Sequence, residues 1–258
     1  MRKRLYFFCW LVPFLIACAF RFYGLNWDDL HLLNPDERFL LQVTESLRIP
    51  ASVQEWLDPQ RSPFNPEQQG FGFYVYGTLP LLFMKIAAEL FPSLPPALVG
   101  RFLNACFDLL TLSCVGGISA LLWKKRKAVF ASMLGYACFV AAIQQAHFFT
   151  VDLPAVFFGT LSLLFLVLLF QEQRPSRFLL LAGLTGLSLG AAMACKVSSA
   201  FFVLFPCLLI PARLLRTGST KPWRGLPLAG LIMFLLSLAF SFRVFQPYAF
   251  QNGSLLDF

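Results

Sequence analysis

Two adjacent acids, Asp36 and Glu37, stand in the stretch Leu-Leu-Asn-Pro-Asp-Glu-Arg-Phe-Leu-Leu over residues 32–41. Asn34 is a preferred helix N-cap, Pro35 favours the first helical position, and Glu37 at the third position would complete a capping box. The pattern therefore predicts a helix start. A helix N-terminus also favours an ionised, oriented carboxylate, and such an Asp36 is suited to act as a general base. The structural and the catalytic interpretations of this stretch are compatible.

A second set of polar residues, Arg101, Asn104 and Asp108, interrupts an apolar run at intervals of three and four residues. That spacing places all three side chains on one face of a helix. Ionisable groups inside a membrane span usually face a protein interior or a water-filled cavity. The stripe either holds helices together or lines a site, and Arg101, near the end of the run, could contact an anionic substrate.

Three further polar residues, His147, Asp152 and Lys196, stand at or near the ends of apolar runs. A histidine near an interface is usually structural, and Asp152 shortly before Pro154 is typical of a helix N-cap; both also suit a substrate site. A buried Lys196 needs an anionic partner, and no acid is adjacent in sequence. Lys196 either extends its ammonium group to the interface or binds a phosphate.

Composition identifies the class of protein that positions these residues. The chain has 258 residues, of which 58% are hydrophobic and 13% charged, and its mean hydropathy is +0.68. A soluble domain of this length cannot bury so much apolar surface, so most of the chain lies in lipid. The net charge of +8 comes from short basic runs between apolar segments, which indicates membrane topology and not nucleic-acid binding. All seven Cys lie in apolar segments, without metal-binding spacing.

Apolar runs that could form membrane helices cover residues 5–22, 74–91, 98–123, 128–143, 153–170, 178–195, 197–212 and 226–242. The basic loops are Arg2 to Arg4, Lys124 to Lys127, Arg174 with Arg177, and Arg213, Arg216, Lys221 and Arg224. If the run at 74–91 does not cross, all basic loops fall on the cytoplasmic side, as the positive-inside rule requires. This run is also the most polar, so we expect a juxtamembrane or re-entrant helix. The result is an all-α integral membrane protein with about seven transmembrane helices, a cytoplasmic N-terminus and an uncleaved first helix.

This topology gathers the polar residues on the outer side. Residues 23–73 form one long loop that contains eight of the 13 acidic residues and further juxtamembrane helices. The other outer loops contain His147, Asp152 and Lys196. Such a concentration of acids, one histidine, one lysine and aromatic residues indicates an active site on this face.

Several stretches match one family pattern in order. They are the Pro-Asp-Glu of residues 35–37, "FYVYGTLPL" at 73–81, "GRFLNACFDLLT" at 100–111, "HFFTVDLPAVFF" at 147–158, "ACKVSSAFFVLFP" at 194–206 and "FQPYAF" at 245–250. Together they resemble the GT-C glycosyltransferases that use polyprenyl-phosphate donors, close to the dolichyl-phosphate-mannose protein mannosyltransferases and the aminoarabinose lipid A transferases. The likeness covers nearly the whole chain. Asn34 replaces a His common in a bacterial subgroup, which keeps the helix cap and removes an imidazole.

The resemblance implies an inverting glycosyltransferase in a bacterial plasma membrane, with residues 1–258 as one membrane module. Asp36 would deprotonate an acceptor hydroxyl of a protein, lipid or polymer, and Glu37, His147 and Asp152 would orient the acceptor or the base. The oxygen would attack C1 of a sugar on a polyprenyl phosphate, and nearby positive charge would stabilise the leaving phosphate. The implied substrate-binding residues are Tyr74, Tyr76, Arg101, His147, Asp152 and Lys196.

Two features depart from the family pattern. "YGTLPL" has no nearby Lys before Lys85, and relatives continue well past "QPYAF", so we expect a fragment or truncated product that lacks the C-terminal part of the pattern. A transporter or flippase and an inactive membrane scaffold are the alternatives, although the internal repeat typical of transporters is not found. No cofactor is firmly predicted, and a divalent metal is left open because no carboxylate cluster is distinctive. Membrane lipids, but not nucleic acids, are expected partners.

Overall fold

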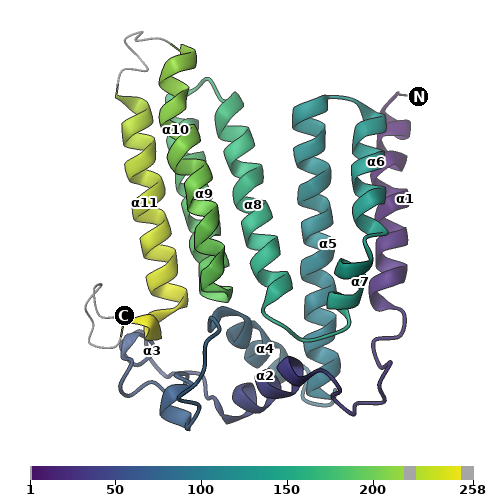
Figure 1. Ribbon diagram of the computed structural model, residues 1–258, viewed down its shortest axis with the longest axis vertical. Helices are drawn as coiled ribbons and strands as arrows, with labels where there is room; N and C mark the ends of the chain where they lie inside the picture. The colour runs from purple at the N-terminus through teal and green to yellow at the C-terminus, as the bar shows by residue number, and fades with distance from the viewer. Residues whose placement is uncertain (1, 218–224, 251–258) are drawn as a thin grey trace.

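The computed structural model describes residues 2–217 and 225–250, and within these ranges the secondary structure is entirely helical. Figure 1 shows a bundle of roughly parallel helices above a layer of short ones. The bundle helices are α1 (Arg2–Phe22), α5 (Pro96–Trp123), α6 (Arg126–Ala137), α7 (Val140–Ala146), α8 (Asp152–Gln171), α9 (Pro175–Cys195), α10 (Leu204–Thr217) and α11 (Leu226–Phe245). The short elements are α2 (Pro35–Ser46), α3 (Val53–Leu57), η1 (Glu67–Gln69), α4 (Leu79–Leu90), η2 (Val197–Val203) and η4 (Pro247–Ala249). The predicted all-α class is confirmed.

Four of the described helices, α5, α8, α9 and α11, are long and apolar enough to cross a membrane. The pair α6–α7 would form a fifth span, although it is bent by 54°. Shorter apolar segments lie at Phe7–Phe22 in α1 and at Val197–Arg213 in η2 and α10. These segments coincide with the predicted runs, and the count of seven crossings stays a prediction.

Small residues let α9 pack closely against α11. A Cβ atom added at Gly186 would lie 2.2 Å from the carbonyl oxygen of Phe234, and one added at Gly190 would lie 2.6 Å from that of Leu238. Backbones can approach this closely only where the side chain is a hydrogen atom, which is a common device at helix interfaces in membranes. The pairing fixes the C-terminal end of α9, where Lys196 follows.

The polar stripe on α5 joins this helix to its neighbours. Asp108 accepts hydrogen bonds from Nε of Arg21 on α1, at 2.5 Å, and from the hydroxyl of Tyr136 on α6, at 2.6 Å. The amide nitrogen of Asn104 donates to the carbonyl oxygen of Phe148 at 2.7 Å. The side chains of Asn104 and Asp108 are fully buried. The structural interpretation of the stripe therefore accounts for these two residues.

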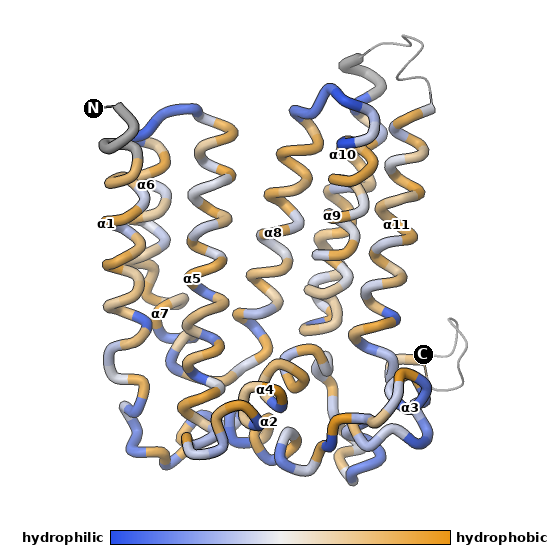
Figure 2. The backbone as a smooth tube through the Cα atoms, turned by 180° about the vertical axis from the view of Figure 1, so that it is seen from behind, coloured by the Kyte–Doolittle hydropathy of each residue, from blue (hydrophilic) through white to orange (hydrophobic). Residues whose placement is uncertain are grey.

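The two ends of the bundle differ in character. The basic connections at 124–127 and 172–177 lie at the same end as the start of α1, and α2, α3 and α4 lie at the other end (Figures 1 and 2). Figure 2 shows the apolar middle of the bundle between two hydrophilic ends. This is the grouping that the charge pattern predicts. Lys221 and Arg224 of the last basic loop lie outside the described residues.

Helix α4 occupies the region where a juxtamembrane or re-entrant helix is predicted. It has 12 residues, which rise about 18 Å, whereas a membrane core is about 30 Å thick. It packs against α2 and the start of α5, at the end of the bundle opposite to the start of α1. That residues 74–91 do not cross the membrane stays a prediction.

Candidate active site

Helix α2 begins as predicted. The side chain of Asn34 accepts hydrogen bonds from the backbone nitrogens of Asp36 and Glu37 at 2.9 and 3.1 Å, and Pro35 is the first helical residue. The two acids then diverge, because successive positions on a helix point about 100° apart. The side chain of Asp36 is exposed, and that of Glu37 is fully buried. They cannot share one chemical role.

Glu37 binds Arg101 in a bidentate ion pair. Nε of Arg101 donates to Oε1 of Glu37 at 2.8 Å, and Nη2 donates to Oε2 at 2.7 Å. The backbone nitrogen of Phe149 also donates to Oε1, at 2.9 Å. The prediction of a capping box is therefore wrong for Glu37: its side chain binds the guanidinium of Arg101 instead of the backbone nitrogen of Asn34, because the charged guanidinium is the stronger donor. Glu37 connects α2 to α5 and to the loop before α8.

Arg101 completes its contacts on a second acid. Its Nη1 and Nη2 donate to the two carboxylate oxygens of Asp28 at 2.8 and 2.9 Å, and Nη1 also donates to the carbonyl oxygen of Leu25 at 2.8 Å. With Glu37, these acceptors occupy all five N–H groups of the guanidinium. The hydrogen bonds from Arg101 lower the pKa of Asp28 to about 2. In this arrangement Arg101 has no donor left for a substrate phosphate, in contrast to its predicted contact.

Asp36 faces Tyr76, whose hydroxyl donates to Oδ1 of Asp36 at 3.3 Å. Burial raises the pKa of Tyr76 above its usual value, and the negative charge of Asp36 raises it further. The ammonium of Lys196 acts in the opposite direction, and Asp152 also contributes. The Tyr76 hydroxyl therefore lies within electrostatic reach of all three charged groups.

Lys196 and Asp152 form an ion pair at the facing ends of two helices. Lys196 caps the C-terminus of α9, Asp152 is the first residue of α8, and Nζ lies 2.6 Å from Oδ1. The N-cap of α8 is Val151, so the predicted capping role of Asp152 is wrong by one position. Both side chains are about two-fifths exposed, which leaves them accessible to a ligand. The anionic partner that Lys196 needs lies 44 residues away in sequence.

A close backbone contact brings Tyr76 to this ion pair. The nitrogen of Gly77 donates to the carbonyl oxygen of Cys195 at 3.0 Å, and a Cβ atom at Gly77 would lie 1.8 Å from the carbonyl oxygen of Ala194. Any larger residue would push this segment off the end of α9. The half-buried Tyr74 fixes the turn by donating its hydroxyl to the carbonyl oxygen of Gly77 at 2.9 Å.

Asp36, Tyr76, Asp152 and Lys196 thus form one group, which we call the charged cluster. Two cavities adjoin it. The first has a volume of about 240 Å³ and contains both apolar and charged side chains, namely Asp152, Ala155, Val156, Gly159, Thr160, Leu163, Lys196, Ser198, Ser199 and Phe202. The second, of about 230 Å³, is more polar and includes Asn65, Glu67, Tyr74, Tyr76, Thr78 and Gln246. The first cavity, apolar with Lys196 and Asp152 in its lining, suits an amphipathic lipid. The second, more polar cavity suits a hydrophilic group.

The family model for dolichyl-phosphate-mannose-protein mannosyltransferases matches residues 59–251. The chain belongs to this family. The match confirms the resemblance found in the sequence, and the apolar helices make this mannosyltransferase-family protein a multi-pass integral membrane protein. The matched range begins after Asp36, so the assignment of Asp36 depends on the geometry of the cluster.

The fold of this mannosyltransferase-family protein is similar to the solved Saccharomyces cerevisiae protein O-mannosyltransferase Pmt1–Pmt2 complex bound to the sugar donor. The TM-score is 0.70 at 18% sequence identity, over 97% of this chain and 34% of the other. At this identity the likeness shows the fold alone, and this chain spans about a third of the length of the yeast one. A comparison with curated protein sequences gives no match.

His147 lies apart from the charged cluster in this mannosyltransferase-family protein. Its two ring nitrogens lie 2.7 Å from the carbonyl oxygen of Ile143 and 2.9 Å from that of Tyr23. The ring therefore joins the loop after α1 to the end of α7, a structural position. Within residues 2–217 and 225–250, no three His, Cys, Asp or Glu side chains come close enough to hold a metal ion.

Sequence reasoning missed two residues that shape the site. The first is Asp28, one of the acids of the outer loop; a buried guanidinium has five N–H donors, more than one carboxylate can accept, and this is the signal that points to a second acidic partner for Arg101. The second is Gln246, within "FQPYAF". Its Oε1 accepts from the nitrogen and the hydroxyl of Thr78 at 2.6 and 2.7 Å. That contact fixes the residue after Gly77, and no sequence signal predicts it.

Proposed function

We propose that the protein is a glycosyltransferase that moves a sugar from a polyprenyl-phosphate donor to a hydroxyl acceptor, with Asp36 as general base. The observation that carries the proposal is the charged cluster, in which Tyr76 lies within reach of both an exposed carboxylate at a helix N-terminus and a lysine that lines an apolar cavity. Family membership supports a lipid-phosphate sugar donor, and the family's description supports a protein acceptor.

The proposed reaction is a single displacement. Asp36 takes the proton of the acceptor hydroxyl, and the oxygen forms a bond to C1 of the sugar on the face opposite the phosphate. The bond between C1 and the phosphate oxygen breaks, and polyprenyl phosphate leaves with the electron pair. The anomeric configuration is therefore inverted. Positive charge stabilises the leaving phosphate where its charge develops, and Lys196 supplies it.

The other residues keep their expected places in modified roles. Glu37 and Arg101 position α2 so that Asp36 points to the cluster, and they do not touch substrate. Tyr76 orients the Asp36 carboxylate, and Tyr74 supports Tyr76 through Gly77. Asp152 holds Lys196 in place before the donor arrives. His147 positions the loop between α7 and α8.

The apolar tail of the donor would lie along α8 in the groove lined by Ala155, Val156 and Leu163. We place the charged cluster on the outer side of a bacterial plasma membrane, with the N-terminus cytoplasmic, because the basic connections lie at the opposite end. Residues 1–258 act as one module, with 23–73 as the outer loop and 74–91 at the membrane surface.

Replacement of Asp36 by Asn tests the proposal. The amide keeps the size and the helix start but cannot accept the acceptor proton, so sugar transfer to the acceptor should be lost. Binding of the lipid donor and membrane insertion should be unchanged. Asp29→Asn, at another exposed acid of the same loop, is the control. Transfer at the control rate by Asp36→Asn would exclude this base, and substrate flux without bond formation would favour the transporter alternative.

A further inference from the structure

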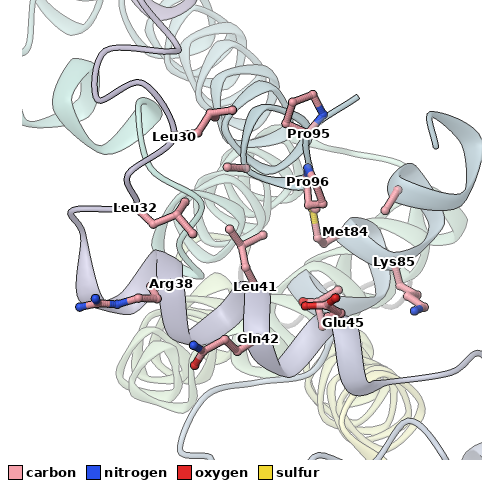
Figure 3. Close-up of a pocket in the computed structure, with 13 residues that line it drawn as sticks. Leu30, Leu32, Arg38, Leu41, Gln42, Glu45, Met84, Lys85, Pro95 and Pro96 are labelled. Atoms are coloured by element: carbon pink, nitrogen blue, oxygen red, sulfur yellow. The ribbon is translucent and has the colours of Figure 1, made fainter. Parts of the chain in front are cut away.

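A third cavity lies on the face of α2 opposite Asp36. Its volume is about 510 Å³, within the range of small-molecule sites. Its lining combines an apolar floor with a polar rim: Leu30, Leu32, Arg38, Leu41, Gln42, Thr44, Glu45, Met84, Lys85, Ala88, Pro95, Pro96 and Ala97. Figure 3 shows α2 along one side of this groove, and α4 with Pro95 and Pro96 at the start of α5 along the other. We call it the α2–α4 groove.

The rim of the groove carries two basic groups that form no ion pair among the described residues. Arg38 and Lys85 lie on opposite sides of the groove (Figure 3), and neither has a carboxylate oxygen within 4 Å in the described residues. Glu45, the one acid in the lining, leaves the rim with net positive charge. The groove therefore suits a ligand with an apolar body and an anionic group.

The groove lies where a membrane surface is expected. On α4 and just after it, Ile86, Leu90, Phe91 and Leu94 are exposed, between 42% and 69% of their maximum. Apolar side chains on a short helix beside membrane-length helices are typical of a helix that lies in the interface. The groove is thus within reach of lipids of the surrounding leaflet.

One wall of the groove is held in a strained conformation. Leu30 and Leu32 have φ angles of 64° and 52°, in the left-handed region that residues with a Cβ atom rarely adopt. The carboxylate of Asp28, itself bound to Arg101, accepts from the nitrogens of Leu30 and Leu33 at 3.2 and 3.3 Å. Strain of this kind persists where surrounding contacts enforce it, often at ligand clamps. Here it directs two leucines to the cavity.

We propose that the α2–α4 groove binds an anionic glycerophospholipid of the membrane, with an acyl chain on the floor and the phosphate at the rim, attracted by both Arg38 and Lys85. This site is separate from the charged cluster, and the proposal does not depend on sugar transfer. A bound lipid would brace the helix that carries Asp36 from its opposite face.

Lipid binding can be measured directly on the full chain in nanodiscs of phosphatidylcholine that contain a small fraction of phosphatidylglycerol. Arg38→Gln and Lys85→Gln should each weaken retention of phosphatidylglycerol about fivefold, the usual worth of one basic residue at an anionic lipid surface. Arg61→Gln removes the same charge from an exposed position of the same loop outside the groove and should have no effect.

A second variant separates the groove from general surface charge. Leu41→Trp keeps every charge and fills the floor, so phosphatidylglycerol should no longer be retained; Ala88→Leu on the facing helix fills it from the other side. A size-exclusion profile like that of the unaltered protein would show that each variant folds. Four results would each overturn the proposal. Both filled variants could retain phosphatidylglycerol, or Arg61→Gln could lose as much of it as the groove variants. The protein could also retain phosphatidylcholine equally well, or polyprenyl phosphate could displace the bound phosphatidylglycerol.

Discussion

Replacement of Arg101 by Met should destabilise the fold strongly and should change donor binding little in the protein that remains folded. The guanidinium makes five hydrogen bonds, and its two anionic partners, Glu37 and Asp28, are buried with it. Removal of one partner from a buried ion pair typically costs about 3–5 kcal/mol, because the remaining charge stays buried. Two stranded carboxylates place the expected loss at the upper end of this range.

The loss can be measured as the unfolding midpoint of the purified protein in mild detergent as a denaturing detergent is added. Arg177→Met is the matched control: Arg177 is 61% exposed, and its contact with Glu172 is 4.0 Å long. Exposed pairs of this kind contribute about 0–1 kcal/mol. Arg101→Lys should restore little stability, since an ammonium cannot reproduce two bidentate contacts.

The opposite result would refute the positioning role. If Arg101→Met unfolds at the midpoint of the unaltered protein and binds the lipid donor more weakly, then the guanidinium contacts the phosphate, as the sequence pattern allowed. The measurement therefore decides between the two interpretations of the stripe on α5.

Two further predictions concern the charged groups. The pKa of Asp28 is about 2 in the folded protein against 3.8 when unperturbed, so its ionised carboxylate contributes about 2 kcal/mol to the free energy of unfolding. This contribution is present above pH 4 and is lost as the pH falls through 2. Asp28→Asn should abolish this acid-dependent part of the unfolding midpoint, and an unchanged dependence of the midpoint on pH would contradict the assignment. Lys196→Gln should weaken binding of the polyprenyl-phosphate donor tenfold or more, which is the usual contribution of a charge-assisted hydrogen bond. Lys125→Gln, at the other end of the bundle, should leave donor binding unchanged. If the two variants bind the donor equally well in a donor-binding assay, the result would count against a phosphate contact of Lys196.

Local features of the sequence predicted local features of the structure. The start of α2 follows from Asn34 and Pro35, which act through their own backbone neighbours. The partner of Glu37 was beyond such reasoning, because Arg101 is 64 residues away and outcompetes the nearby backbone for the carboxylate. Helix spacing also fixed the common face of Arg101, Asn104 and Asp108. It could not show which neighbour that face meets.

The number of membrane crossings illustrates a second limit. The apolar run at 128–143 predicts one helix, but the structure ends α6 at Ala137 and begins α7 at Val140 with a 54° bend. The apolar composition of a segment indicates that it prefers lipid, but it does not predict where a helix within the segment is interrupted. At 197–203 the chain forms a 3₁₀ helix, which rises about 2.0 Å per residue against 1.5 Å in an α-helix. The short run there therefore reaches farther than its residue count suggests.

The ion pair of Lys196 with Asp152 has a consequence that separates their roles. In the free protein Asp152 neutralises the lysine at 2.6 Å, so a donor phosphate must compete with a carboxylate for the same ammonium. Asp152→Asn removes the competing charge and should tighten donor binding severalfold, opposite in sign to Lys196→Gln. Both side chains are about two-fifths exposed, so the fold should lose no more than about 1 kcal/mol. Weaker donor binding by Asp152→Asn at unchanged stability would show instead that the carboxylate itself holds the donor, by accepting a charge-assisted hydrogen bond from a sugar hydroxyl that a neutral amide accepts less strongly.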